Sequence, residues 1–128
     1  MYLLDTCALL MLGGRQEDLP QKVVTLLENH PHALYVSTIT AFEIVLKHSL
    51  GKLLLPIPPD QWYRKAVELY AIEELDVNSR IAMTSAALPF IHKDPCDRFI
   101  IATANECKMI IITADRIIPK YPNIKVIW

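Results

Sequence analysis

The sequence lacks the motifs that would assign it directly to a common enzyme or binding class. It has no GxSxG serine-nucleophile motif, no P-loop, no GxGxxG fingerprint and no zinc-ligand spacing. Its net charge of -1 argues against a protein that coats DNA mainly by neutralising phosphates. No apolar run approaches the roughly 18 residues that span a bilayer, and the N-terminus lacks the basic region of a signal peptide. We therefore expect a soluble cytoplasmic protein.

Cysteine is also scarce, with Cys7, Cys96 and Cys107 as the three present. None of them forms a CxxC pair, and an odd, scattered set fits a reducing compartment better than a disulfide framework. The simplest interpretation is three small, partly buried side chains. Because Cys7 and Cys96 lie close in sequence to Asp5 and Asp97, a reactive thiol near a site is the alternative.

The alternation of strand-like and helix-like segments predicts the fold class. Hydrophobic residues make up 52% of the 128 residues, enough for the core of a single domain over residues 1–128. Continuous apolar strands alternating with helices predict a three-layer α/β/α sandwich with a central parallel sheet. Strands are expected at residues 2–4, 34–36, 76–77, 109–112 and 125–128. Helices are expected at residues 8–12, 20–30, 40–50, 61–72, 79–88 and 95–108.

Two aspartates follow apolar segments that are typical of buried strands. Asp5 comes directly after Tyr2–Leu4, and Asp115 comes soon after Met109–Ile112. If these segments are neighbouring parallel strands, both acids emerge at the carboxyl edge of one sheet, where open α/β folds bind ligands. Each acid has a simpler interpretation: Asp5 as the cap of the next helix, and Asp115 as a turn residue.

Glu43 is an acid inside an apolar stretch of a predicted helix. Thr40 and Glu43 match a capping box, and Lys47 stands one turn further on, where it can form an ion pair. Against these local interpretations, Glu43 lies between Phe42 and Ile44, where burial of an unpaired charge is costly. A bound cation would remove that cost.

Asp94 and Asp97 stand at the start of the helix that Pro95 opens. We assign Asp94 to capping, because Asp is preferred just before a helix and Pro at its first position. Asp97 lies in the first turn, where the helix dipole favours a carboxylate. It also heads an i, i+3, i+4, i+7 apolar stripe that runs to Ala104 and faces the sheet. An inward carboxylate usually has a cationic partner or a metal ion.

The four acids together predict a metal site. Asp5, Glu43, Asp97 and Asp115 offer hard oxygen ligands, which favour Mg²⁺ or Mn²⁺. Several acids are needed, because Mg²⁺ takes only one or two protein carboxylates directly while others orient water and a second ion. Clusters of this kind typically hydrolyse phosphodiesters. Thr6, next to Asp5, can add a hydroxyl to the site.

The sequence allows two interpretations for each of two basic residues near Asp97. His92 can contact a phosphate or act as a base, or it is an ordinary loop residue. Arg98 can stabilise charge in the transition state or contact RNA, or it covers the outer face of its helix.

In these residues the sequence resembles the PIN-domain ribonucleases of the VapC toxin type, over nearly the whole chain. The resemblance rests on an ordered set of segments: Tyr2-Leu3-Leu4-Asp5-Thr6, Val36-Ser37, Phe42-Glu43-Ile44, Ser49 to Leu53, His92 to Arg98, Ile101 to Ala104, and Thr113-Ala114-Asp115. It implies a flavodoxin-like fold and RNA cleavage that depends on Mg²⁺ or Mn²⁺. It also implies a homodimer inhibited by an antitoxin protein, a segment of which occupies the groove near the acids.

The resemblance also assigns roles to particular residues. By motif match, the family's acids fall on Asp5, Glu43, Asp97 and Asp115, and the supporting hydroxyls on Thr6 and Thr113. Two positions depart from the pattern: Cys7 stands where relatives often carry His, and Cys96 where they often carry Phe. Neither change removes an acid, but both can alter packing at the site or make it sensitive to oxidation.

The leading hypothesis is a metal-dependent endoribonuclease that is the toxin of a toxin–antitoxin pair. In this hypothesis Asp5, Glu43 and Asp97 hold the first cation, and Asp115 acts through water or recruits a second ion. One alternative is a Mg²⁺-dependent phospho-acceptor signalling domain, although Asp5 stands alone where such domains carry paired acids. A second alternative is a catalytically silent PIN-like binding protein.

Overall fold

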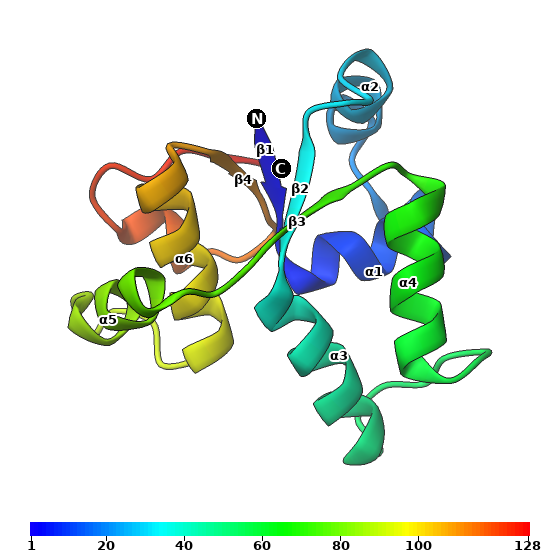
Figure 1. Ribbon diagram of the computed structural model, residues 1–128. Helices are drawn as coiled ribbons and strands as arrows, with labels where there is room; N and C mark the ends of the chain where they lie inside the picture. Colours follow the sequence, from blue (N-terminus) through cyan, green and yellow to red (C-terminus); the bar gives the residue numbers. More distant parts are fainter.

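The computed structural model describes residues 1–128 as a five-stranded parallel sheet between two layers of helices (Figure 1). This confirms the predicted α/β sandwich with a central parallel sheet. The strands are β1 (Tyr2–Leu4), β2 (Leu34–Ser37), β3 (Glu73–Leu75), β4 (Ile110–Ile112) and β5 (Val126–Ile127). The helices are α1 (Thr6–Gly14), α2 (Gln21–Asn29), α3 (Thr38–Ser49), α4 (Pro59–Leu69), α5 (Ser79–Ala87) and α6 (Pro95–Cys107). None of these helices combines the length and apolar character needed to cross a membrane.

The strand order β3-β2-β1-β4-β5 places β1 at the centre of the sheet. Leu4 of β1 lies opposite Val36 of β2 on one side and opposite Ile112 of β4 on the other. The chain runs outward from β1 to β2 and β3, and then returns to β4 on the other side of β1. The connections that leave β1 and β4 therefore diverge, and this topology opens a crevice at the carboxyl ends of the two strands.

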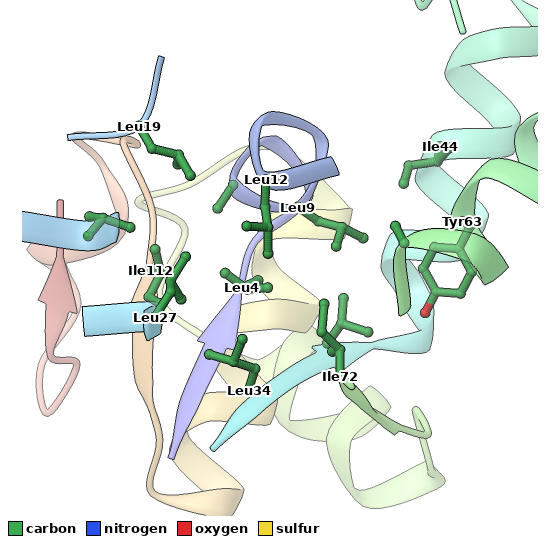
Figure 2. Close-up of a cluster of buried hydrophobic side chains, with 14 of the residues drawn as sticks. Leu4, Leu9, Leu12, Leu19, Leu27, Leu34, Ile44, Tyr63, Ile72 and Ile112 are labelled. Carbon is green, nitrogen blue, oxygen red and sulfur yellow. The ribbon is translucent and has the colours of Figure 1, made fainter. Parts of the chain in front are cut away.

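The core has two halves, because side chains alternate between the faces of a strand. Leu4 packs in the cluster that includes residues of α1, α2 and α4, and Figure 2 shows it with Leu9, Leu12 and Ile112. Leu3 points to the opposite face and packs with residues of α5 and α6. Figure 1 shows α5 and α6 on one side of the strands, and α1 and α4 on the other.

Helix α3 begins earlier than the sequence predicted, and this changes the interpretation of Glu43. Strand β2 runs directly into α3, and the Ser37 hydroxyl caps the helix by accepting the Ile39 N–H at 3.2 Å. Thr40 is therefore inside the helix, where its hydroxyl is 3.2 Å from the Thr6 hydroxyl. The predicted capping box of Thr40 and Glu43 is wrong.

Several other predicted boundaries and caps can be compared with the structure. Helix α1 begins at Thr6 rather than residue 8, because the Asp5 carboxylate caps it. The third strand lies at Glu73–Leu75 rather than residues 76–77. Helix α5 begins at Ser79, as expected, and the Asn78 side chain caps it by accepting the Ile81 N–H. The predicted Asp94 cap of α6 is confirmed, since its carboxylate accepts the Cys96 N–H at 2.9 Å.

Candidate metal centre

A polar pocket of about 270 Å³ opens at the carboxyl ends of β1 and β4 and is bounded by α3 and by the start of α6. We call it the acidic pocket. Five carboxylates and one ammonium group are among the side chains that line it. The lining residues are Asp5, Thr6, Cys7, Glu43, Lys47, Asp94, Asp97, Ala114 and Asp115. The fold thus brings together the four acids that the sequence singled out, which are spread over more than a hundred positions.

Asp5 is the most buried of these acids, with only 4% of its surface exposed. Its Oδ1 accepts the Ala8 N–H at 2.8 Å, and its Oδ2 accepts a hydrogen bond from the Thr113 hydroxyl. Burial raises the pKa of Asp5 to about 6, although the hydrogen bonds from Thr113 and Ala8 oppose the rise. The capping interpretation is confirmed, since Oδ1 caps α1, and the same carboxylate also lines the acidic pocket.

Glu43 reaches the acidic pocket from the second turn of α3. Its side chain is buried, and its Oε2 lies 3.3 Å from the Lys47 ammonium. The ion pair that the sequence suggested is present, but it neutralises one carboxylate out of five. Lys47 is the sole basic side chain that lines the pocket.

Asp97 enters the acidic pocket from the first turn of α6, as the helical stripe predicted. Burial and the neighbouring charge of Asp94 raise the pKa of Asp97 well above its usual range, and His92 opposes the rise. The Asp97 Oδ2 lies 3.2 Å from the His92 Nε2. In Asp97, as in Asp5, burial is the largest cause of the raised pKa, and the charges of neighbouring carboxylates add to it.

Asp115, like Asp5, accepts hydrogen bonds on both of its oxygens. Its Oδ1 accepts the N–H groups of Ile117 at 2.6 Å and Ile118 at 3.1 Å. Its Oδ2 lies 2.9 Å from the His92 Nε2. Partial burial tends to raise the pKa of Asp115, but the hydrogen bonds from His92, Ile117 and Ile118 outweigh it, and the pKa is lowered.

The structure corrects the interpretation of His92 as an ordinary loop residue. His92 is buried, and its ring lies against both Asp97 and Asp115. Its backbone N–H donates to the Tyr121 hydroxyl at 2.7 Å, and that hydroxyl donates to the Pro89 carbonyl at 2.7 Å. Tyr121 was not predicted, because its partners depend on contacts far apart in the sequence.

Arg98 also differs from both interpretations drawn from the sequence. It is buried rather than spread over the outer face of α6, and it does not line the acidic pocket. Its guanidinium donates to four carbonyl oxygens at 2.8–3.2 Å, those of Ser85, Leu88, Pro89 and His92. A guanidinium engaged in this way holds the segment between α5 and α6 in place and is not free to contact a phosphate.

The donor set of the pocket fits a hard divalent cation. Among the carboxylates, those of Asp97 and Asp115 lie within 4.8 Å of each other, as do those of Glu43 and Asp94, and Asp5 belongs to neither group. Carboxylate oxygens are the donors that Mg²⁺ and Mn²⁺ prefer. A cation placed among them would offset the cost of the buried charges.

Neither cysteine near the pocket has the properties of a reactive thiolate. Burial and the surrounding carboxylates raise the pKa of Cys96 to about 12. Partial burial and the charge of Asp5 also raise the pKa of Cys7. Because the thiolate is the nucleophile and the metal ligand, these shifts oppose the alternative of a reactive thiol.

A second cavity, of about 400 Å³, lies among α1, α2 and the end of α4. Eight of its twelve lining residues are hydrophobic, and Glu28 is its one carboxylate. It lacks the clustered acids that phosphodiester chemistry requires. The acidic pocket is therefore the better candidate for the functional site.

Comparison with known proteins identifies the family and supports the fold. Ribonuclease VapC22 of Mycobacterium tuberculosis is 29% identical over 102 residues, which cover 77% of this chain and 77% of that protein. The DNA-bound VapBC structure from Salmonella typhimurium has a TM-score of 0.72 at 18% identity and covers 98% of this chain and 96% of that chain. FitAcB from Neisseria gonorrhoeae has a TM-score of 0.70 at 22% identity, and the match covers 100% of this chain and 97% of that chain. Residues 2–124 match the PIN domain, and the chain therefore belongs to the PIN domain family.

Proposed function

We propose that this protein is an endoribonuclease that depends on Mg²⁺ or Mn²⁺ and is the toxin of a toxin–antitoxin pair acting in the cytoplasm. The observation that carries the proposal is the convergence of Asp5, Glu43, Asp97 and Asp115 on one pocket with a single lysine. Membership of the PIN domain family and the similarity to a VapC ribonuclease support RNA as the substrate.

In this proposal Asp5, Glu43 and Asp97 hold the first cation, and Asp115 acts through water or a second ion. When bound, the cation supplies Lewis-acid stabilisation of the charge that develops on the phosphate. The protein contributes the orientation of the ligands. The Thr113 hydroxyl directs Asp5, and the contact between the Thr6 and Thr40 hydroxyls joins the start of α1 to α3.

Lys47 has a separate role in the proposal. Its ammonium lies at the edge of the acidic pocket, paired with Glu43 and partly open to solvent. A positive charge in this position attracts the phosphate of an RNA strand that would otherwise be repelled by the acids.

The partners proposed for this chain are an antitoxin protein and a second copy of the chain. Relatives of the same fold have been crystallised in a toxin–antitoxin complex from Klebsiella pneumoniae and in VapBC bound to DNA. By analogy, we expect a segment of the antitoxin to occupy the groove beside the acidic pocket.

The test is cleavage of structured RNA in the presence of Mn²⁺. The wild-type protein should cut, and Asp5→Asn should not, because it removes a charged ligand while keeping the size of the side chain. Asp76→Asn is the matched control, since Asp76 is exposed and does not line the acidic pocket. Equal cleavage by Asp5→Asn would defeat the assignment.

Two other results would favour the alternatives. Tight binding of an antitoxin without cleavage of any RNA tested would indicate a silent PIN-like binding protein. A stable acyl phosphate after incubation with acetyl phosphate would indicate a phospho-acceptor domain.

A further inference from the structure

His92 contributes the nitrogen atom to the group of possible metal ligands that it forms with Asp97 and Asp115. Its ring can serve the site in two ways, as a metal ligand or as a hydrogen-bond donor. A neutral imidazole carries one ring hydrogen. If the hydrogen lies on Nδ1, the Nε2 lone pair is free to bind a metal ion. If the hydrogen lies on Nε2, that atom is a hydrogen-bond donor and cannot be a ligand.

The backbone decides between these two forms. The Asp94 N–H points at the His92 Nδ1 and donates a hydrogen bond to it at 3.1 Å. The Nδ1 lone pair is used in this bond, so the ring hydrogen lies on Nε2. Nε2 in turn faces two acceptors, the Oδ2 of Asp115 at 2.9 Å and the Oδ2 of Asp97 at 3.2 Å.

The segment that carries His92 is held firmly enough to maintain this orientation. Arg98 donates to the His92 carbonyl at 3.2 Å, and Tyr121 accepts the His92 N–H at 2.7 Å. Asp94 cannot turn its N–H away easily, because its own side chain caps α6. The other tautomer would place Nδ1–H against the Asp94 N–H, so that two donors would face each other. A ring flip would put a carbon in place of Nδ1 and lose the hydrogen bond.

We propose that His92 is a positioning residue that donates its Nε2–H to Asp115 and lies against Asp97, fixing the two carboxylates relative to each other without binding the cation itself. The inference rests on the proposed function only for the identity of the cation. It makes the candidate metal centre an all-oxygen site. It also leaves the Oδ1 of Asp97 free to bind a cation, while Asp115 is held by donors on both oxygens.

The state of the ring can be read directly by ¹⁵N NMR of the histidine side chains at about pH 8, where an ordinary imidazole is neutral. In the cation-free protein, we expect His92 to show hydrogen on Nε2 and a lone pair on Nδ1. Addition of Mg²⁺ should leave this pattern unchanged. Hydrogen on Nδ1 in either sample, or loss of the Nε2 hydrogen on addition of Mg²⁺, would overturn the inference.

The positioning role is tested by Mn²⁺ affinity, measured by calorimetry. His92→Phe keeps a ring but removes the donor, and we expect binding weaker by about 10- to 100-fold, as is typical when a group that orients a metal ligand is lost. His92→Gln can still donate from its amide and should lose less. His32→Gln is the control, because His32 is exposed and outside the acidic pocket.

Thermal unfolding of the cation-free variants separates positioning from general stability. His92→Phe should bind Mn²⁺ more weakly than His92→Gln even if the two variants have similar melting temperatures. Wild-type affinity in His92→Phe would refute the positioning role. If the wild-type protein itself binds no Mn²⁺ and cuts no RNA, the proposed function fails, whereas the ring hydrogen in the cation-free sample still decides the geometric part of the inference.

Discussion

The hydroxyl of Thr113 donates a hydrogen bond to the carboxylate of Asp5 across 108 positions of sequence. Thr113 follows β4 and Asp5 follows β1, two strands that pair in parallel at the centre of the sheet. The bond joins the carboxyl ends of these strands at the point where the acidic pocket opens. It therefore couples the geometry of the sheet to the direction of the most buried acid in the site.

Replacement of Thr113 should weaken cation binding without unfolding the protein. Thr113→Val keeps the shape of the side chain and removes the donor, which raises the pKa of Asp5 further, since that hydrogen bond lowers it. We expect Mn²⁺ affinity to fall about 10-fold. Calorimetry measures the effect, and Thr25→Val on the exposed face of α2 is the control. Unchanged affinity in Thr113→Val would show that Asp5 needs no orientation by this hydroxyl.

The free energy of unfolding of the cation-free protein should fall as the pH rises from about 4 to about 6. The folded-state pKa of Asp5 is raised from 3.8 to about 6, so the folded protein keeps a proton that the unfolded chain releases in this range. The contribution of Asp5 is fully present below pH 3.8 and is lost as the pH passes 6, which amounts to about 3 kcal/mol.

The pH effect is measured by urea unfolding of the wild type and of Asp5→Asn at several pH values. The stability of the wild type relative to Asp5→Asn should decrease over this range, and saturating Mg²⁺ should restore most of the loss above pH 6. A difference between the two proteins that is constant with pH would contradict the raised pKa of Asp5.

Removal of Lys47 should separate cation binding from RNA binding. Lys47→Met deletes the positive charge that faces Glu43. Because one charge in a partly exposed site is worth about 1 kcal/mol, Mn²⁺ should bind about three- to tenfold more tightly to this variant. The same change should weaken RNA binding, seen as a higher KM. Lys65→Met on the exposed surface of α4 is the control. Weaker Mn²⁺ binding in Lys47→Met would mean that Lys47 supports the cation instead of competing with it.

Replacement of Arg98 should lower the free energy of unfolding much more than replacement of an exposed arginine. Arg98→Lys leaves several buried carbonyl oxygens between α5 and α6 without donors, and we expect a loss of about 3 kcal/mol in the free energy of unfolding. Arg80→Lys, which changes an exposed ion pair with Glu106, should cost little. Chemical unfolding measures both. A small loss in Arg98→Lys would show that water can replace the guanidinium.

Much of the fold could be predicted because its determinants are local. The apolar segments before Asp5 and Asp115 identified β1 and β4, since buried parallel strands need continuous hydrophobic residues. The stripe headed by Asp97 placed that acid on the inner face of α6 for the same kind of reason. Cap positions were harder, because Ser37 and Thr40 are both good caps by type and only the end of β2 selects Ser37.

The roles of His92 and Arg98 could not be predicted, because most of their partners are brought near only by folding. The Arg98 guanidinium is satisfied by carbonyls whose directions depend on how α5 ends, and no residue type in the sequence reports this. The His92 ring is oriented by an N–H of Asp94 and by two acids from separate elements.

The sequence by itself determined the order of strands and helices, the identity of the acids and their placement at element ends, because hydrophobic periodicity and capping act over a few residues. Tertiary structure alone decided which carboxylates meet, how deeply each is buried and which hydrogen bonds direct them. The physical reason is that desolvation and hydrogen bonding depend on distances of a few ångströms, and in this protein those distances join residues from opposite ends of the chain.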